Sequence, residues 1–388
     1  MSAAEPVPNS PAASGPTPTA PAAEAASIPW ADPARVAAFN AWLAGLVTSH
    51  GVQPDSLRPA SADASFRRYF RVDATSAAPA APAAQASLIV MDAPPSQEDS
   101  QPFVDLARAL AAGGLNVPEV LAWDAAHGFM LLTDLGERTY LDALHALDFT
   151  SPAGQRRADG LYRDALGALL RLQALPVPAN LPTYDAAMVQ RELALFPEWY
   201  IGVHRGITLS AAQQQVLDDA FAVITRVFGE QPQVLVHRDF HSRNLMPGVP
   251  GHADGAPGVL DFQGAVLGPI GYDLASLLRD AYFDWDEAQQ LDWAVRYWDQ
   301  ARRTAVPVPA DFGDFWRDVD WAALQRHLKV LGIFARLSHR DGKHAYLDHL
   351  PRVWQQAHTV AARYSVLRPL SRLLEQVGDV EVHEGYTF

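Results

Sequence analysis

The sequence predicts an α+β protein with two lobes: a small N-terminal lobe with an antiparallel sheet and a helix-rich C-terminal lobe. Between residues 29 and 135, short apolar runs typical of strands are interspersed with two amphipathic helical segments. From Leu161 onward, the apolar periodicity is mostly helical. The length of 388 residues suits two or three folding units. We therefore assign the N-terminal lobe to residues 29–135 and the C-terminal lobe to residues 136–388.

Two segments are too poor in large apolar side chains to be expected in a packed core. Residues 1–28 are nearly all Ala, Pro, Ser and Thr, which predicts a disordered tail. The tail lacks the basic start and apolar stretch of a secretory signal and the arginines of a transit peptide, so we expect a cytoplasmic protein. Residues 73–86 are rich in Ala and Pro and are expected to form a disordered loop insertion within the N-terminal lobe.

The N-terminal lobe is expected to open with a helix of about 17 residues, from Asp32 to near Gly51. Its apolar residues recur at steps of three and four. Strands are expected over residues 65–72 and 87–91, as a hairpin, and over residues 118–123 and 129–133. A second helix is expected around Phe103–Leu110, closed by Gly113 and Gly114.

The C-terminal lobe is expected to contain helices over residues 161–175, 189–200, 211–228, 288–301 and 321–337. Two short apolar runs interrupt this helical pattern: Val234–Val236 and Val259–Asp261. A loop of Gly, Pro and polar residues separates them, so they are candidate strands with a functional site between them.

Composition excludes several classes of function. Lys and Arg together number 30 against 44 Asp and Glu, a net charge of -14 that disfavours nucleic acid as a partner. No apolar run approaches the length of a membrane span, so no membrane partner is expected. The absence of cysteine excludes disulfides, thiolate nucleophiles and iron–sulfur clusters. The only lysines are Lys329 and Lys343, so there is no Gly-Lys-Ser/Thr phosphate loop, and phosphate chemistry would need arginine, backbone amides and a metal ion.

Three oxygen-bearing side chains lie at the ends of apolar runs in the segments 236–245 and 259–262: Asp239, Asn244 and Asp261. Mg²⁺ prefers oxygen ligands and usually takes only one or two from the protein, a role that suits Asn244 and Asp261. Asp239 can orient a hydroxyl group and accept its proton in phosphoryl transfer. The alternative is that these residues only cap turns, but two independent spacings and the apolar flanks favour catalysis.

The pattern His237-x-Asp239-x-x-x-x-Asn244, followed by Asp261, resembles the catalytic segment of the aminoglycoside phosphotransferase and choline kinase-like superfamily. That resemblance implies a bilobal protein-kinase-like fold, with ATP and Mg²⁺ as cofactors. It also implies that Leu131–Gly136 is the hinge between the lobes, with Thr133, Asp134 and Leu135 at the adenine. Tyr272–Ala275, after the metal-binding Asp, also matches the superfamily.

The resemblance can be narrowed, and it then covers the chain from about residue 37 onward. Four segments are similar to the family of bacterial anomeric kinases of N-acetylmuramate and N-acetylglucosamine: residues 63–71, 91–95, 237–246 and 261–263. This similarity implies phosphorylation of the C1 hydroxyl of these sugars in peptidoglycan recycling. The alternatives are a kinase for another acceptor, such as an aminoglycoside, choline or homoserine, and a catalytically silent nucleotide-binding scaffold.

One departure from the superfamily concerns the ATP phosphates. The superfamily usually places a lysine on the third strand of the small lobe, where this chain has Met91. The phosphate loop is not glycine-rich either, so the turn Ser65–Arg68, which begins with Ser65 and Phe66, is expected to cover the phosphates. Arg67, Arg68 or Arg71 would supply the positive charge; strand alternation sends Arg67 and Arg71 to one face and Arg68 to the other. Candidate carboxylate partners are Glu98, Asp99 and Asp105.

The acceptor site is less well defined by sequence, and a monomer is expected. Ser242 and Arg243 follow the proposed base, and either contact the acceptor or belong to a solvated loop. A lactyl carboxylate would favour Arg243 or Arg205. Glu192 and Glu198 are further candidates, which either bind sugar hydroxyls or form the exposed face of a helix. Residues 336–346 form either a solvated helix end or the rim of the cleft. His237 is expected to brace the loop, and zinc binding by His237 and His241 is disfavoured because that segment is not helical.

Overall fold

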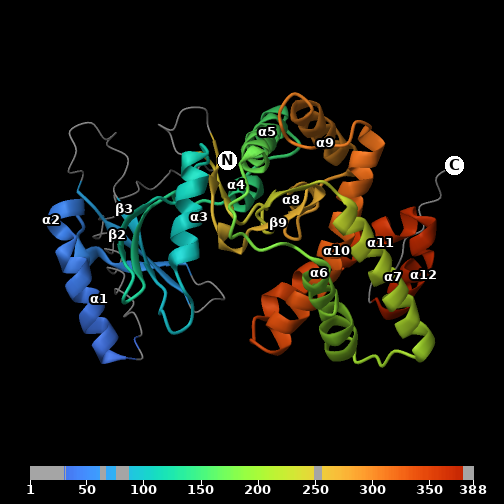
Figure 1. The fold of residues 1–388 in the computed structure, drawn as a ribbon, viewed down its shortest axis with the longest axis horizontal. Helices are drawn as coiled ribbons and strands as arrows, with labels where there is room; N and C mark the ends of the chain where they lie inside the picture. The colour runs from blue at the N-terminus through green and yellow to red at the C-terminus, as the bar shows by residue number, and fades with distance from the viewer. Residues whose placement is uncertain (1–29, 31, 62–66, 76–86, 249–255, 379–388) are drawn as a thin grey trace, which may run out of the picture.

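The computed structural model describes residues 30, 32–61, 67–75, 87–248 and 256–378, which form two lobes (Figure 1). The expected N-terminal tail lies outside the described residues. So do residues 76–86 of the expected insertion, together with Ser65 and Phe66 of the expected phosphate-covering turn. None of the helices in the described part is long and apolar enough to cross a membrane.

The N-terminal lobe is built on a five-stranded sheet with strand order β1-β2-β3-β5-β4, in which every neighbouring pair is antiparallel. The predicted hairpin is confirmed as β2 and β3, in which Phe70 pairs with Val90. The edge strand β1 was not predicted, because its sequence Arg-Pro-Ala-Ser carries no apolar alternation. The strands are β1 (Arg58–Ser61), β2 (Arg68–Asp73), β3 (Ser87–Asp92), β4 (Val120–Asp124) and β5 (Phe129–Thr133).

Both faces of this sheet are covered, which explains why β3 and β5 are nearly continuous apolar runs. Successive side chains of a strand point to opposite faces. Leu88 and Val90 of β3 therefore join a core cluster with α1 (Pro33–Gly45), whereas Met91 joins a different cluster with α3 (Gln101–Ala112). In Figure 1, α1 lies on the outer side of the sheet and α3 lies on the side facing the second lobe.

The first predicted helix is present but interrupted. α1 ends at Gly45, and a short helix, α2 (Val47–His50), continues after Leu46. Gly51 closes it with a φ of +66°, a left-handed conformation that glycine adopts without steric cost. A Cβ atom there would lie 2.2 Å from the carbonyl oxygen of Thr75, so this turn requires glycine.

The C-terminal lobe is organised around α10 (Phe312–His339), a 28-residue helix most of whose side chains are buried. The predicted helix 189–200 is instead two helices, because Pro197 cannot supply the N–H of a regular α-helical hydrogen bond. The remaining helices are α4 (Tyr140–His145), α5 (Pro152–Ala174), α6 (Ala186–Leu193), the π-helix Phe196–His204, α7 (Ala211–Glu230), α8 (Gly271–Leu278), α9 (Glu287–Ala301), α11 (Leu350–Arg363) and α12 (Arg368–Val377).

Two small antiparallel ladders carry the loops that the sequence singled out. β6 (Gln233–Val236) pairs with β9 (Val266–Pro269), and β7 (Leu245–Met246) pairs with β8 (Gly258–Val259). Residues 237–244 connect β6 to β7, and Asp261 follows β8 after one residue. The two ladders thus bring the predicted catalytic and metal-binding segments together.

Candidate active site

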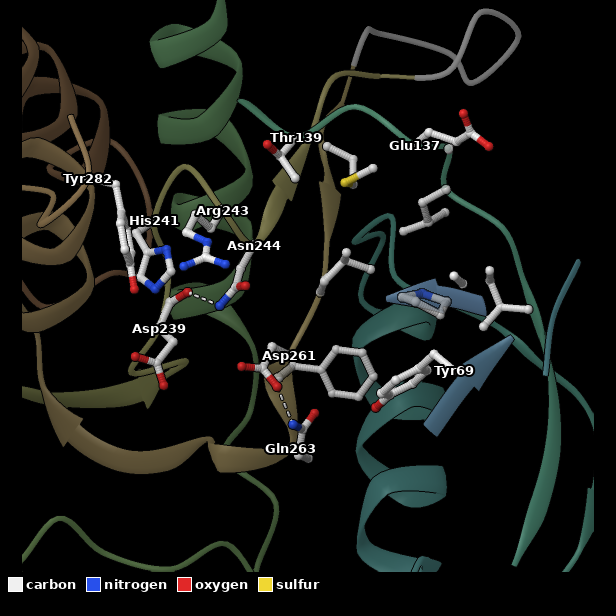
Figure 2. Close-up of a pocket in the computed structure, with 18 of the residues that line it drawn as sticks. Tyr69, Glu137, Thr139, Asp239, His241, Arg243, Asn244, Asp261, Gln263 and Tyr282 are labelled. Atoms are coloured by element: carbon white, nitrogen blue, oxygen red, sulfur yellow. Dashed lines mark hydrogen bonds between the residues drawn. The ribbon is translucent and has the colours of Figure 1, made fainter. Parts of the chain in front are cut away.

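A cavity of about 800 Å³ lies between the two lobes. The N-terminal lobe contributes apolar and aromatic side chains, including Tyr69, Ile89 and Leu132. The C-terminal lobe contributes Asp239, Asn244 and Asp261, which Figure 2 shows together on one side of the cavity. The three residues that the sequence predicts as the catalytic centre therefore lie at a common cavity wall.

The loop that carries Asp239 is held in an unusual backbone conformation. Arg238 has a φ of 76°, which is uncommon for a residue other than glycine. The buried carboxylate of Asp273, in the first turn of α8, accepts hydrogen bonds from the backbone N–H groups of His237 (2.7 Å) and Arg238 (2.9 Å). Asp273 thus fixes the start of the loop, which positions Asp239 at the cavity wall.

His237 braces this loop against the segment that carries Asp261. Its ring Nδ1 lies 3.2 Å from the backbone N–H of Asp239, and its Nε2 lies 2.9 Å from the carbonyl oxygen of Leu260. Burial lowers the pKa of His237, so the ring is neutral, accepts from Asp239 and donates to Leu260. This geometry agrees with the structural role predicted for His237.

The carboxylate of Asp239 opens into the cavity, where the side chain is 41% exposed, and cations surround it. Arg326 Nη1 lies 3.5 Å from its Oδ1. Burial alone would raise the pKa of Asp239, but Arg326 and Lys329 hold that pKa well below its usual range. Asp239 is therefore a carboxylate at neutral pH, available to accept a hydrogen bond from a hydroxyl group.

Asn244 and Asp261 both line the cavity, and both carry side-chain oxygen atoms. The side-chain amide of Asn244 donates from Nδ2 to the carbonyl oxygen of Asp239 (3.0 Å), which leaves Oδ1 as the atom able to bind a cation. Asp261 has a φ of 63°, a second left-handed non-glycine residue at this site, and its carboxylate accepts a hydrogen bond from Gln263. No cluster of three or more His, Asp or Glu suited to a metal ion occurs in the described residues. Asn244 and Asp261 alone suit Mg²⁺, because this ion takes few protein ligands and completes its coordination shell with phosphate and water oxygens.

The predicted hinge lines the cavity and is tied to the sheet by Arg71. The guanidinium of Arg71 binds the carboxylate of Asp134 (2.5 and 3.0 Å), the carboxylate of Glu137 (2.7 Å) and the carbonyl oxygen of Gly136 (2.9 Å). Thr133, Asp134 and Leu135 all line the cavity, as expected for a segment that contacts a nucleotide base. Arg71 faces the cavity, but its donors are used to hold the hinge.

The structure separates the other two candidate arginines as strand alternation predicts. Arg68 lies on the outer face of the sheet, where its guanidinium is 3.8 Å from the Trp30 ring and pairs with Asp92, so its predicted contact with ATP is wrong. Arg67 lies on the opposite face and pairs with Glu98 (2.5 Å), one of the predicted carboxylate partners. Met91 is fully buried in the core and does not line the cavity.

Of the five predicted acceptor contacts, only Arg243 lines the cavity. Glu198 is exposed on the π-helix. Arg205 donates to the carbonyl oxygens of Val377 (3.0 Å) and Gly378 (3.4 Å) at the end of α12, because that helix terminus leaves carbonyl groups unpaired. Ser242 is a buried residue of the loop 237–244 and does not line the cavity. The structure thus corrects the expectation of direct acceptor contacts for Glu192, Glu198, Arg205 and Ser242.

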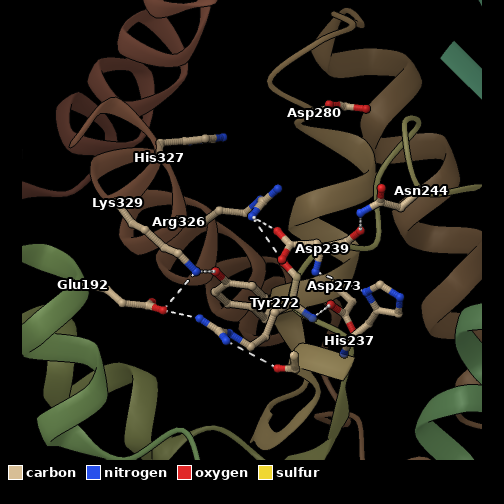
Figure 3. A network of polar contacts seen from close by, with 12 residues as sticks. Glu192, His237, Asp239, Asn244, Tyr272, Asp273, Asp280, Arg326, His327 and Lys329 are labelled. Carbon is tan, nitrogen blue, oxygen red and sulfur yellow. Dashed lines mark hydrogen bonds and ion pairs between the residues drawn. The ribbon is translucent and has the colours of Figure 1, made fainter. Parts of the chain in front are cut away.

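Glu192 instead belongs to a buried polar network that includes Lys329 and Tyr272 (Figure 3). It forms ion pairs with Lys329 (3.0 Å) and Arg238, and accepts hydrogen bonds from Tyr184 and Gln325 (3.1 Å). Lys329 itself lines the cavity. Glu192 therefore orients Lys329, which reaches the cavity, rather than reaching it itself.

Sequence reasoning missed the contribution of α10. Arg326, Lys329, Val330, Ile333, Phe334 and Leu337 all line the cavity from this helix. The signal was present, because these residues recur at steps of three and four and the stripe has two cations at one end. Residues 336–346, weighed as a cleft rim, do contribute Leu337 and Tyr346. The other missed cavity residues include His241, whose pKa burial lowers to about 4, and Tyr282.

Comparison with known proteins places this site in a family. Residues 56–311 match the phosphotransferase enzyme family. The chain belongs to that family. A similar protein, the N-acetylmuramate/N-acetylglucosamine kinase of Pseudomonas aeruginosa, is 44% identical over 350 residues, which cover 88% of this chain and 97% of the relative. The equivalent protein of Neisseria meningitidis is 42% identical, over 85% of this chain and 93% of the relative.

Solved structures of other phosphotransferases share the fold. The choline/ethanolamine kinase family protein of Mesorhizobium loti matches with a TM-score of 0.55 and 15% identity, over 88% of this chain and 99% of that one. The ADP-bound aminoglycoside phosphotransferase APH(2'')-Ib matches with a TM-score of 0.52 and 16% identity, over 85% and 97%. The predicted bilobal protein-kinase-like fold and the superfamily resemblance are thus confirmed, and this phosphotransferase is a kinase.

Proposed function

We propose that this phosphotransferase transfers the γ-phosphoryl group of ATP to the anomeric C1 hydroxyl of N-acetylmuramate, N-acetylglucosamine or both, as a step of peptidoglycan recycling. The observation that carries the acceptor assignment is the identity of 42–44% to kinases named for these two sugars, over nearly their whole length. The site supports the reaction class, because a charged Asp239 opens into the cavity beside a pair of oxygen ligands.

In this proposal Asp239 is the catalytic residue. Its carboxylate accepts a hydrogen bond from the C1 hydroxyl, aims the oxygen at the γ-phosphorus and takes the proton as the new O–P bond forms and ADP leaves. The low pKa of Asp239 means that it takes this proton late, as a loose phosphoryl-transfer transition state requires. Asn244 and Asp261 would hold Mg²⁺, which neutralises charge on the phosphates.

The nucleotide is assigned to the side of the cavity formed by the sheet and hinge. Ile89, Leu132 and the segment Thr133–Leu135 offer an apolar slot with backbone groups beside it, which suits a purine base. Arg67 is our candidate for the role of the missing lysine, because it lies on the inner face of the sheet and pairs with Glu98 as such a cation would. Arg67→Gln should then raise KM for ATP, whereas Arg68→Gln should not.

The charges at the acceptor end argue against cationic acceptors. Among the described residues, four carboxylates line the cavity. Asp134 and Glu137 lie at the hinge, so only Asp239 and the proposed metal ligand Asp261 remain at the acceptor end. Three cations do: Arg243, Arg326 and Lys329. Arg326 pairs with Asp239 and Lys329 with Glu192, which leaves Arg243 without a carboxylate partner among the described residues. Such a cation favours a neutral or anionic sugar over an aminoglycoside or choline.

The test is phosphoryl transfer from ATP with Mg²⁺ to N-acetylmuramate, N-acetylglucosamine, glucose, kanamycin, choline and homoserine. Phosphorus NMR of the product identifies the carbon that carries the phosphate. We expect the two N-acetyl sugars to be phosphorylated at C1. Asp239→Asn should lower kcat by about 10²–10⁴-fold with nucleotide affinity retained. Asp218→Asn, on the exposed face of α7, is the matched control.

Each alternative predicts a different pattern in this assay. Transfer to kanamycin, choline or homoserine alone would keep the kinase and reject the sugar. Tight nucleotide binding with no transfer to any acceptor would favour the silent scaffold. Full activity of Asp239→Asn would remove Asp239 from its proposed role.

A further inference from the structure

Four arginine or lysine side chains line the cavity in the described part of the chain, and one of them differs from the rest in its partners. No carboxylate of the described residues forms an ion pair with Arg243. An unpaired cation facing a cavity is a place where an anionic ligand can bind without first displacing a protein carboxylate. The paired cations are Arg71, with Asp134 and Glu137; Arg326, with Asp239; and Lys329, with Glu192.

Aromatic rings hold Arg243 in place without neutralising it. Its guanidinium carbon lies 4.8 Å from the ring centre of Tyr282 and 6.0 Å from that of Tyr346, and both tyrosines line the cavity. Such cation–π contacts favour the charged arginine and restrict its position. Figure 2 shows Arg243 beside His241 and Tyr282, on the side of the cavity that carries Asp239 and away from Glu137, the residue after the hinge.

A buried carboxylate fixes the two halves of this arrangement relative to each other. Asp280 is fully buried and accepts hydrogen bonds from the backbone N–H groups of Ser242 and Tyr282, both at 2.9 Å. Ser242 directly precedes Arg243, so Asp280 ties the loop that carries the arginine to the segment that carries the ring. The cation is therefore preorganised, which reduces the entropic cost of binding a ligand there.

We propose that Arg243, seated on Tyr282 and Tyr346, binds the carboxylate of N-acetylmuramate and makes the acceptor site favour the acidic amino sugar over the neutral one. The inference rests on the proposed function. N-acetylmuramate differs from N-acetylglucosamine by a lactyl ether at O3, which carries a carboxylate. With the C1 hydroxyl at Asp239, the substituent at C3 lies two ring carbons away, at the same end of the cavity. A planar guanidinium can bind that carboxylate through two parallel hydrogen bonds.

The experiment measures kcat/KM for N-acetylmuramate, for its methyl ester and for N-acetylglucosamine, with ATP and Mg²⁺ held saturating. The ester keeps the shape of the acid but removes its charge. In Arg243→Gln we expect the ratio of kcat/KM for the acid to that for N-acetylglucosamine to fall about 10–100-fold, the usual worth of a charged hydrogen bond. The ratio for the ester should change little. Arg226→Gln, an exposed arginine on α7, should leave both ratios unchanged.

The outcomes separate this inference from the function on which it rests. An equal loss for all three sugars in Arg243→Gln would place the arginine on the phosphates or in the loop framework, and would overturn the inference. Turnover of N-acetylglucosamine but not of N-acetylmuramate by the unmodified protein would also overturn it. Turnover of neither sugar would overturn the proposed function itself. Residual turnover of N-acetylglucosamine by the variant reports that it has folded.

Discussion

At the scale of single residues, Glu192 shows how one carboxylate supports the site without lining it. Its side chain is 11% exposed and pairs with both Lys329 and Arg238. Burial alone would raise the pKa of Glu192, but Lys329 and Arg238 lower it, so it stays charged in the fold. Removing one member of a buried ion pair leaves the others without compensation and is costly.

We therefore expect Glu192→Gln to lower the free energy of unfolding by about 3 kcal/mol. Turnover should fall too, because Lys329 would be free to move relative to Asp239. Urea unfolding and a kinase assay measure the two effects. Glu198→Gln is the matched control: Glu198 is exposed on the next helix and should change neither quantity. Equal stability of the two variants would contradict the anchoring role of Glu192.

Asp318 on α10 is the opposite case, a carboxylate that the fold disfavours. Burial raises its pKa to about 6, with a smaller opposing effect from Arg317. Between pH 4 and 6 the folded protein holds a proton that the unfolded chain has released, so this group contributes less stability as pH rises through that range. Asp318→Asn should therefore raise the free energy of unfolding at pH 8 by on the order of 1–2 kcal/mol. Urea unfolding at pH 8 and at pH 4 tests this, since the gain should vanish at pH 4; a gain of the same size at both pH values would argue against a titration effect.

At the scale of elements, α10 carries one wall of the cavity, and its position depends on a close approach. A Cβ atom on Gly332 would lie 2.3 Å from the carbonyl oxygen of Leu195, between α6 and the π-helix, and 2.6 Å from the Leu195 Cβ. Gly332 is flanked on the helix by Lys329 and Ile333, which both line the cavity. A shift of α10 at this point would therefore move the site.

Gly332→Ala should destabilise the protein by about 2–3 kcal/mol. The new methyl group would clash with the backbone of Leu195, which cannot move aside as the end of a flexible side chain could. KM or kcat should change as α10 moves. Gly160→Ala in α5 is the matched control, since nothing lies within 4 Å of its Cβ position. That variant should be unchanged or stabilised by about 0.5–1 kcal/mol from helix propensity. Thermal unfolding compares the stability of the two variants. If Gly332→Ala were as stable as the unmodified protein, α10 could move away from Leu195 at little cost.

The same scale shows what could be read from sequence. The N-terminal strands and helices were predicted because alternation and closing glycines are local signals, whereas β1 lacks any such pattern. Asp239, Asn244 and Asp261 were found because their spacing is short and specific. Arg326 was missed because it meets Asp239 from 87 residues further along the chain, and only packing brings them together. Periodicity identified the helix bearing Glu192, but whether a side chain turns to a cavity or to a buried lysine is decided by tertiary contacts.

At the scale of the whole molecule, both lobes line the cavity, so a ligand bound there adds to the contacts that already join the lobes, such as the hinge, α3 and the hydrogen bond from the Val259 N–H to the carbonyl oxygen of Asn116 (2.8 Å). The Phe103 ring of α3 stacks on Phe262, next to the proposed metal ligand Asp261, with ring centres 5.0 Å apart. A metal ion and nucleotide bound at Asp261 would thus stabilise this contact between the lobes, in addition to their part in phosphoryl transfer. Stability should be linked to their binding by mass action.

We expect Mg-ATP at 100 times its Kd to raise the free energy of unfolding by about 2.7 kcal/mol, provided the unfolded chain does not bind it. Chelation of Mg²⁺ by EDTA should remove most of this gain, because the phosphates would then lose the cation that links them to Asn244 and Asp261. Asp261→Ala should lose the Mg²⁺-dependent part of the gain. Asp239→Ala should keep that part while losing turnover, since the proposed role of Asp239 is to contact the acceptor rather than the metal. Thermal unfolding across a nucleotide titration, with and without Mg²⁺, measures all four cases. If Asp239→Ala lost the gain and Asp261→Ala kept it, the proposed roles of the two carboxylates would have to be exchanged.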